Sequence, residues 1–215
     1  MTTIITPDWP APPNIVAGST TRDTENRDLP ENLCYLNQVH GAAVVSAEGL
    51  RDAEQPLDAD AVTAHRPGEV CAVRTADCLP VLFCSMDGAR VAAAHAGWRG
   101  LAAGVLENTV DAMGVAPDTL LAWLGPAISQ ANFEVGQEVR EAFLAHDANA
   151  EACVEPNARG RWQADLYGLA QLRLAGAGVE RIFGGGWCTF ADAGRFYSYR
   201  RDQDTGRMVS FVALK

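Results

Sequence analysis

A cysteine and a histidine lie on either side of a turn signal in residues 75–100, TADCLPVLFCSMDGARVAAAHAGWRG. The signal is Asp87-Gly88, a dipeptide typical of two-residue type I′ turns between apolar strands. A hairpin around this turn places His95 opposite Pro80 and makes Cys78 the diagonal neighbour of His95 on the same face. Diagonal neighbours lie roughly 7–8 Å apart, and a metal ion about 2.3 Å from sulfur and about 2.0 Å from nitrogen could bridge them. The spacing therefore predicts a site for metal binding or thiol chemistry.

His40 is a candidate for a third ligand. It closes the run LCYLNQVHGAA at the end of a predicted strand, and Gln38 lies two residues earlier on the same strand face. A histidine buried in the core with its hydrogen bonds satisfied is the alternative. Three protein ligands leave the fourth position of a tetrahedral ion open for water or substrate, as in catalytic zinc sites. If His40 joins the pair, Gln38 becomes a candidate for contact with the substrate.

Two carboxylates are candidates for proton transfer. Asp77 is adjacent to Cys78 and could be an acid/base group or the hydrogen-bond partner of a histidine. Glu134, in the run NFEVG, lies in an apolar patch that could raise its pKa. An exposed turn is the alternative for Glu134.

Three arginines are candidates for phosphate binding. Arg99 stands in the first turn of a helix that should begin beside His95, where free N–H groups and the helix dipole attract anions. Arg200 and Arg201 follow the aromatic run FYSY, on which a nucleobase could stack, and their side chains could pair with phosphate. The alternatives are a solvated arginine at position 99 and an ordinary edge strand over residues 196–201.

Strand patterns dominate the first half of the chain. We expect strands at 13–18, 33–39, 42–47, 59–64, 69–75, 80–86, 89–95, 120–124 and 181–183, helices at 99–113, 136–146 and 165–176, and a closing hairpin of 195–201 with 207–213. Both faces of the hairpin around Asp87-Gly88 are apolar: Leu82, Cys84, Val91 and Ala93 share one face, and Val81, Phe83, Ala92 and Ala94 share the other. A sheet of this kind is covered on both sides. The pattern therefore predicts a layered α/β (α+β) domain with a central mixed β-sheet.

Composition limits the classes of function. The 215 residues are 48% hydrophobic and carry a net charge of −10, which predicts one folded domain over residues 1–215 and disfavours a nucleic-acid polymer as partner. The N-terminal residues lack the pattern of a signal peptide, and no run is long and apolar enough for a membrane span. We therefore expect a soluble cytoplasmic protein. Neither GxGxxG nor GxxxxGKS occurs, so neither of these nucleotide-binding loops applies.

Five motifs occur in order along the chain: NQVHG, TADCLPVLF, AAAHAGWRG, LGPAISQANFEVG and FYSYRRD followed by TGRMVSF. Together they resemble the family once called multicopper polyphenol oxidases, or laccase-like proteins, and now described as purine nucleoside phosphorylases. The resemblance extends over about residues 33–213. It implies a layered α/β fold with a mixed sheet, and it matches His40, Cys78 and His95 to the family's zinc ligands.

The resemblance implies phosphorolysis of adenosine, inosine, guanosine and methylthioadenosine, together with adenosine deamination. In that case nucleoside and phosphate are the partners, Asp77 or Glu134 moves the proton, and zinc activates water for deamination. A bacterial branch implies an alternative, an amidase that edits a peptidoglycan precursor. A non-catalytic zinc protein is a second alternative, with Cys188 as the candidate fourth ligand. A multicopper oxidase is disfavoured because four histidines cannot supply a three-copper cluster, although adventitious copper could occupy the same ligands.

Overall fold

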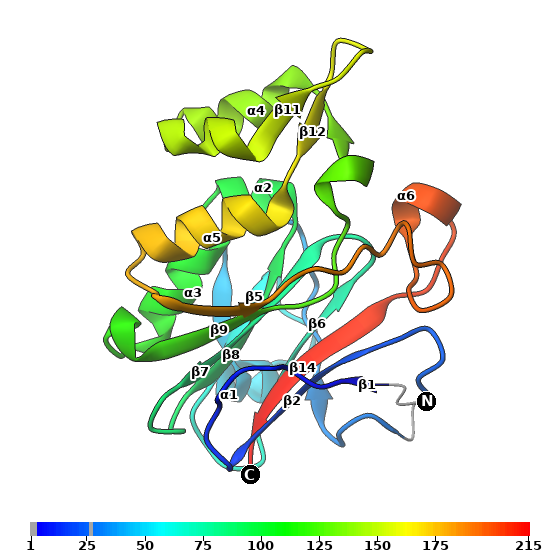
Figure 1. Cartoon of the computed structure of the whole chain (residues 1–215). Coiled ribbons are helices and arrows are strands. Elements are labelled where there is room, and N and C mark those ends of the chain that lie inside the picture. Colours follow the sequence, from blue (N-terminus) through cyan, green and yellow to red (C-terminus); the bar gives the residue numbers. More distant parts are fainter. Residues whose placement is uncertain (1–3, 26–27) are drawn as a thin grey trace.

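The hairpin that contains the predicted turn is the centre of the fold (Figure 1). The computed structural model describes residues 4–25 and 28–215. In it, β7 (Leu79–Ser85) pairs antiparallel with β8 (Val91–Ala96), and Pro80 lies opposite His95, so the predicted register is confirmed.

The turn type differs from the prediction. A type I′ turn needs positive φ at both central residues, whereas only Gly88 has it, at 70°. The turn closes through a hydrogen bond from the Gly88 N–H to the Ser85 carbonyl (2.9 Å), so its central residues are Met86 and Asp87 and not the predicted Asp87-Gly88. The carboxylate of Asp87 accepts from the Ser85 hydroxyl (2.6 Å) and from the Ala89 N–H (3.0 Å). With these bonds Asp87 does not need a positive φ, and β7 and β8 still pair in the predicted register.

Around this hairpin, six strands form a mixed sheet in the order β13-β9-β7-β8-β5-β4. Its other members are β13 (Arg181–Gly184), β9 (Leu120–Leu124), β5 (Ala61–Ala64) and β4 (Val44–Ser46). The β13/β9 and β4/β5 pairs are parallel, and the remaining pairs are antiparallel. The predicted central mixed sheet is therefore confirmed.

A second sheet covers one face of the six-stranded sheet. It has the order β1-β2-β14-β6-β3 and comprises β1 (Ile4–Ile5), β2 (Ile15–Thr20), β14 (Met208–Leu214), β6 (Val70–Thr75) and β3 (Leu33–Cys34). Leu82, Cys84, Val91 and Ala93 of the hairpin pack here against Val73 and Val212. The predicted division of the hairpin into two apolar faces is confirmed on this side.

The helices are α1 (Ala47–Asp52), α2 (Trp98–Ala102), α3 (Val105–Met113), α4 (Gln137–Leu144), α5 (Leu166–Gly176) and α6 (Tyr199–Asp202). Residues of α2, α3, α4 and α5 belong to the apolar cluster on the opposite face, whereas α1 packs in the cluster between the two sheets and α6 buries no residue. The second hairpin face, Val81, Phe83, Ala92 and Ala94, packs in one cluster with apolar residues of α3 and α5. The longest helix has 11 residues, whereas a membrane span needs about 20, and no helix of the described residues could cross a membrane.

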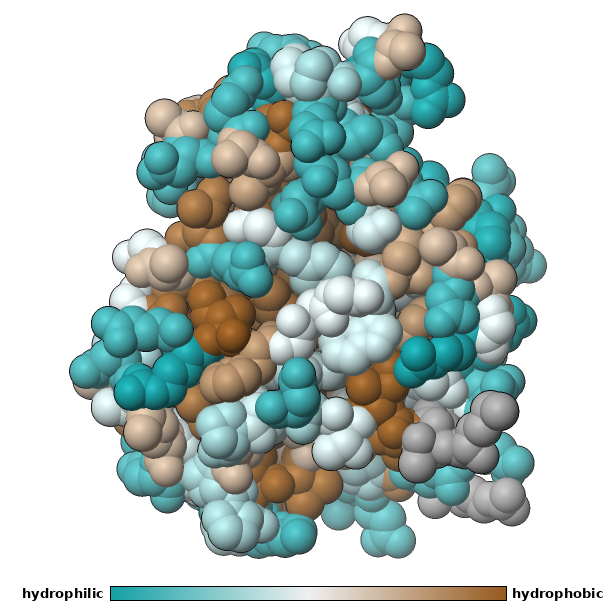
Figure 2. All heavy atoms as spheres, viewed as in Figure 1, coloured by the Kyte–Doolittle hydropathy of each residue, from teal (hydrophilic) through white to brown (hydrophobic). Residues whose placement is uncertain are grey.

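A small antiparallel sheet lies beside α4. It has the order β10-β12-β11 and consists of β10 (Glu134–Val135), β12 (Trp162–Ala164) and β11 (Val154–Pro156). Together with α4 it stands at the top of Figure 1, and mainly hydrophilic side chains cover this part in Figure 2.

Three sequence predictions of secondary structure are wrong. The predicted closing hairpin does not form, because β14 pairs with β2 and β6, while residues 199–202 form α6. The predicted helix 99–113 is split at Gly104, whose φ of 95° ends one helix before the next begins. The predicted strand 33–39 is reduced to β3 and one bridge at Asn37.

Candidate active site

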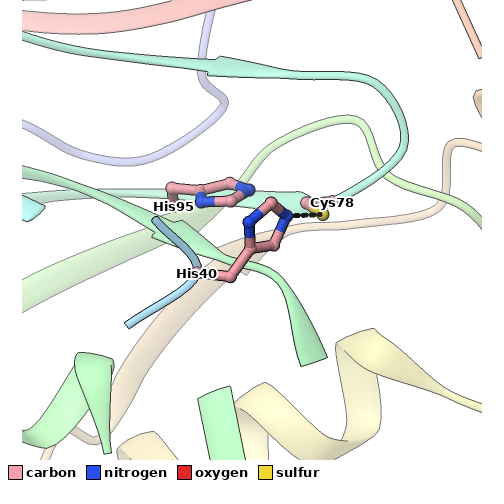
Figure 3. A group of neighbouring side chains, drawn as sticks. All are labelled: His40, Cys78 and His95. Carbon is pink, nitrogen blue, oxygen red and sulfur yellow. Dashed lines mark hydrogen bonds between the residues drawn. The ribbon is translucent and has the colours of Figure 1, made fainter. Parts of the chain in front are cut away.

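His40, Cys78 and His95 converge from three segments of the chain. Their candidate ligand atoms all lie within 4.8 Å of one another, and the Cys78 Sγ lies 4.0 Å from the His40 Nε2 (Figure 3). The two imidazole rings meet edge to face with centroids 4.9 Å apart. Two ligands of a tetrahedral zinc ion lie roughly 3.5 Å apart, given metal distances of about 2.0–2.3 Å. The group therefore fits a metal ion after a small contraction.

Each residue of the group has a different structural support. Cys78 directly precedes β7, and His95 lies near the end of β8, so the hairpin brings them together as predicted. His40 lies in a turn with φ of 59°, instead of at a strand end. Gly97 leaves space for all three: a Cβ at this position would lie 3.0 Å from the Cys78 Sγ and 3.1 Å from the His40 Cδ2.

Asp60 connects the two histidines, and the sequence analysis missed it. Its fully buried carboxylate accepts a hydrogen bond from the His95 Nδ1 at 2.7 Å. It also accepts from the backbone N–H groups of Val39, His40 and Gly41 at 3.2, 3.0 and 2.7 Å. The sequence does carry a signal, because a carboxylate between Ala59 and Ala61 at the start of a buried strand needs donors from elsewhere.

The group is strongly polarised before any metal binds. Burial of Cys78 would raise the pKa of its thiol, but hydrogen bonds from His40 and His95 outweigh this and lower the pKa to about 6. Burial would lower the pKa of His95, but its hydrogen bonds to Asp60 and Cys78 raise the pKa to about 9. Both shifts favour the pair in which a Cys78 thiolate lies beside a His95 imidazolium. The thiolate is the form of cysteine that binds metals and attacks electrophiles.

A cavity of about 620 Å³ opens over the group. This volume lies within the range of small-molecule sites. Apolar side chains on its wall are Trp98, Ile128, Phe133 and Leu166, and arginines on its wall are Arg74, Arg200 and Arg207. The cavity therefore combines a candidate metal group with surfaces that could hold an aromatic ring and an anion.

Of the two predicted acid/base residues, only Asp77 lines this cavity. Its carboxylate accepts from the Thr189 hydroxyl at 2.6 Å and from the Arg200 N–H at 2.9 Å. It does not contact either histidine, so the predicted histidine partner is Asp60 instead. Glu134 does not line the cavity, and its carboxylate pairs with Arg159 and accepts from the Asn157 amide.

The predicted residues for phosphate and substrate binding also differ in whether they line the cavity. Arg200 lines the cavity, whereas Arg201 donates to the backbone carbonyls of residues 189, 190 and 196 and holds that loop. Arg99 is exposed, stacks on Trp98 and does not line the cavity. Gln38 lines it, and its amide is bonded to both backbone groups of Arg74 at 2.8 Å.

The structure brings in two arginines that the sequence analysis missed. Arg74 and Arg207 stand on the cavity wall, from β6 and from the segment before β14. The Sγ of Cys188, the candidate fourth ligand, accepts hydrogen bonds from Ser129 and Asn132. Among the described residues it does not belong to the group formed by His40, Cys78 and His95.

Comparisons with known proteins agree over nearly the whole chain. A protein named purine nucleoside phosphorylase from Pseudomonas aeruginosa is 49% identical, with 98% of each chain covered. Purine nucleoside phosphorylase YfiH from Escherichia coli is 47% identical, with 100% of each chain covered. The crystal structure of Neisseria meningitidis protein NMB0706 has a TM-score of 0.93 at 42% identity, over 100% of both chains. The family described as multi-copper polyphenol oxidoreductase laccase matches residues 12–215, and this chain belongs to that family.

Proposed function

We propose that this chain is a purine nucleoside phosphorylase with adenosine deaminase activity, and that it works with zinc held by His40, Cys78 and His95. The observation that carries the proposal is the placement of this group on the wall of a cavity that also presents aromatic rings and arginines. The names of the relatives from Pseudomonas aeruginosa and Escherichia coli support a nucleoside as the substrate. Adenosine, inosine, guanosine and methylthioadenosine are the proposed substrates, and the cytoplasm is the proposed location.

The cavity offers separate surfaces for the parts of a nucleoside and for phosphate. Trp98 and Phe133 provide aromatic walls against which a purine base can pack. Arg200 lies next to this surface, with its guanidinium carbon 5.4 Å from the centre of the Phe133 ring. With Arg74 and Arg207 it supplies guanidinium groups for a phosphate that attacks the ribose C1′.

Asp77 is the residue best placed to hold a proton near the reacting bonds. It borders Cys78 in the chain and lines the cavity, and two donors fix its carboxylate. Bound zinc supplies a Lewis acid that polarises substrate oxygen or lowers the pKa of water. In our proposal Asp77 transfers the proton in deamination, and the arginines neutralise phosphate in phosphorolysis.

The test is turnover of adenosine by purified, zinc-loaded protein with and without phosphate. We expect adenine and ribose 1-phosphate only when phosphate is present, and inosine under both conditions. Cys78→Ser and His95→Ala should abolish both products, whereas His146→Ala, at an exposed histidine outside the site, should leave them unchanged. Production of neither adenine nor inosine by the wild type would overturn the proposal.

The thiolate and imidazolium pair favours one second candidate, an amidase that edits a peptidoglycan precursor. Cys78 would attack the amide carbon, and His95 would protonate the leaving amine, after which water would release the acyl group. Metal-free protein mixed with cell-wall amides should then show an acyl adduct on Cys78 by intact mass. Zinc bound in a one-to-one ratio with full activity would exclude this route, because ligation occupies the thiolate.

The older oxidase description of the family does not fit this set of residues. A three-copper cluster needs many histidines, whereas the chain has four. Two of these, His65 and His146, are exposed and lie outside the metal group. The native chemistry we propose is therefore not multicopper oxidation, and copper at this site would be adventitious.

A further inference from the structure

We propose that Asp60 is the positioning residue of the metal site, because its single carboxylate orients one ligand and fixes the backbone of another. The inference rests on the proposed metal site at His40, Cys78 and His95, and it does not depend on which substrate is processed. Asp60 is fully buried and precedes β5, so it cannot reach the cavity or a substrate itself.

The first route runs to the ring of His95. The Asp60 Oδ1 lies 2.7 Å from the His95 Nδ1, and His95 is 3% exposed. A neutral imidazole has one N–H and one free lone pair. With Nδ1–H donated to Asp60, the lone pair is on Nε2, the nitrogen available to a metal ion beside Cys78. Asp60 therefore selects the tautomer that can bind the metal.

The second route runs to the turn that carries His40. Three consecutive N–H groups, those of Val39, His40 and Gly41, converge on the two carboxylate oxygens at 2.7–3.2 Å. His40 has a φ of 59°, an uncommon conformation for a residue with a Cβ. The converging bonds hold the turn in this conformation and aim the His40 ring at Cys78 (Figure 3).

A buried carboxylate elsewhere in the chain provides a matched control. Glu69 is 7% exposed and accepts from the backbone N–H groups of His65 and Arg66 at 3.2 and 3.1 Å. It thus fixes a turn as Asp60 does, but it contacts none of the three candidate ligands. A general effect of losing a buried carboxylate should appear in both positions, whereas an effect on the metal site should appear only at Asp60.

The experiment compares Asp60→Asn with Glu69→Gln. The dissociation constant for zinc is measured by competition with a chelator, and folding is measured by circular dichroism. We expect Asp60→Asn to bind zinc about 10- to 100-fold more weakly, and Glu69→Gln to bind zinc like the wild type even where both variants melt earlier. Cobalt loading gives a second readout, since its absorption spectrum should change in Asp60→Asn and not in Glu69→Gln. Zinc binding by folded Asp60→Asn at wild-type affinity, or no zinc binding by the wild type, would overturn the proposal.

Nitrogen-15 NMR of the wild type keeps the inference testable if Asp60→Asn fails to fold. The zinc-loaded protein should show His95 with a proton on Nδ1 and the metal on Nε2, and the reverse would overturn the inference. Turnover separates the two proposals. Weak zinc binding by Asp60→Asn together with an inactive wild type would remove the nucleoside function and leave the role of Asp60 intact. An active wild type with unchanged zinc affinity in Asp60→Asn would leave the nucleoside function intact and remove the role of Asp60.

Discussion

Gly97→Ala adds one methyl group at the point where the three candidate ligands meet. The new Cβ would lie 3.0 Å from the Cys78 Sγ and 3.1 Å from the His40 Cδ2. Alanine is otherwise compatible with the backbone, because Gly97 has a φ of −63° and a ψ of 155°. The change therefore perturbs the three ligands through the added volume, while the loss of a favourable N-cap residue affects α2.

The size of the effect follows from these distances. Non-bonded carbon atoms prefer separations of about 3.5–4.0 Å, so Cys78 and His40 must each move by roughly half an ångström. Sites of this kind need their ligands within about 0.5 Å of the productive positions. We expect zinc to bind about 10-fold more weakly, which equals about 1.4 kcal/mol. Overpacking should also lower the free energy of unfolding by about 1–3 kcal/mol.

The assay is zinc competition with a chelator on folded protein, with Gly176→Ala as the control. Gly176 ends α5, and a Cβ there would meet nothing within 4 Å. This variant should keep the zinc affinity of the wild type and gain up to about 1 kcal/mol of stability. If folded Gly97→Ala binds zinc as tightly as the wild type, the three side chains do not share one ion in the way the structure indicates.

Three further predictions test the surroundings of the site. Arg200→Ala should raise KM for phosphate and lower Tm less than Arg201→Ala, since the Arg200 guanidinium donates to one backbone carbonyl and that of Arg201 to three, at about 1 kcal/mol each. Burial raises the pKa of the Cys188 thiol, but hydrogen bonds, chiefly from Ser129, outweigh burial and lower it. Ser129→Ala should therefore raise that pKa and reduce the thiolate fraction at pH 7. Labelling of Cys188 by iodoacetamide should then be slower. Gly104→Ala should reduce stability by about 1–3 kcal/mol in urea unfolding, because φ is 95° there.

Local sequence signals predict the half of the site that the hairpin builds. Asp87-Gly88 and the alternation of apolar residues determine which residues face each other, and this brings Cys78 to His95 without any other part of the chain. The predicted turn type is wrong, but the predicted register of β7 and β8 is right, because the register depends on which faces of the strands are buried. The same periodicity predicted the two apolar faces of the sheet correctly.

The other half of the site depends on contacts between distant segments. His40 joins the group through a turn whose N–H groups donate to Asp60, 20 residues further along the chain. Local sequence propensities do not predict a hydrogen bond between residues this far apart. Residues 195–201 alternate like a strand, yet their backbone does not pair with the backbone of β14 and bonds instead to other backbone groups and to side chains. The Asp77 carboxylate accepts from the Arg200 N–H, and the Ser198 hydroxyl caps α6. Such bonds override strand propensity, which is weak and depends on context.

The arrangement of these bonds explains why the site can be both rigid and open. His95 and the turn of His40 share Asp60, which is fully buried, so two of the three candidate ligands are anchored in the core. The Asp77 carboxylate is held by a separate set of bonds, from the Thr189 hydroxyl and from the Arg200 N–H. A substitution of the Arg200 side chain can therefore alter the bound substrate and leave the metal ligands in place, because this side chain contacts the Glu134 carbonyl and the Phe133 ring. A substitution at Asp60 should instead weaken the metal site first, because its carboxylate contacts His95 and the backbone of His40 and does not line the cavity.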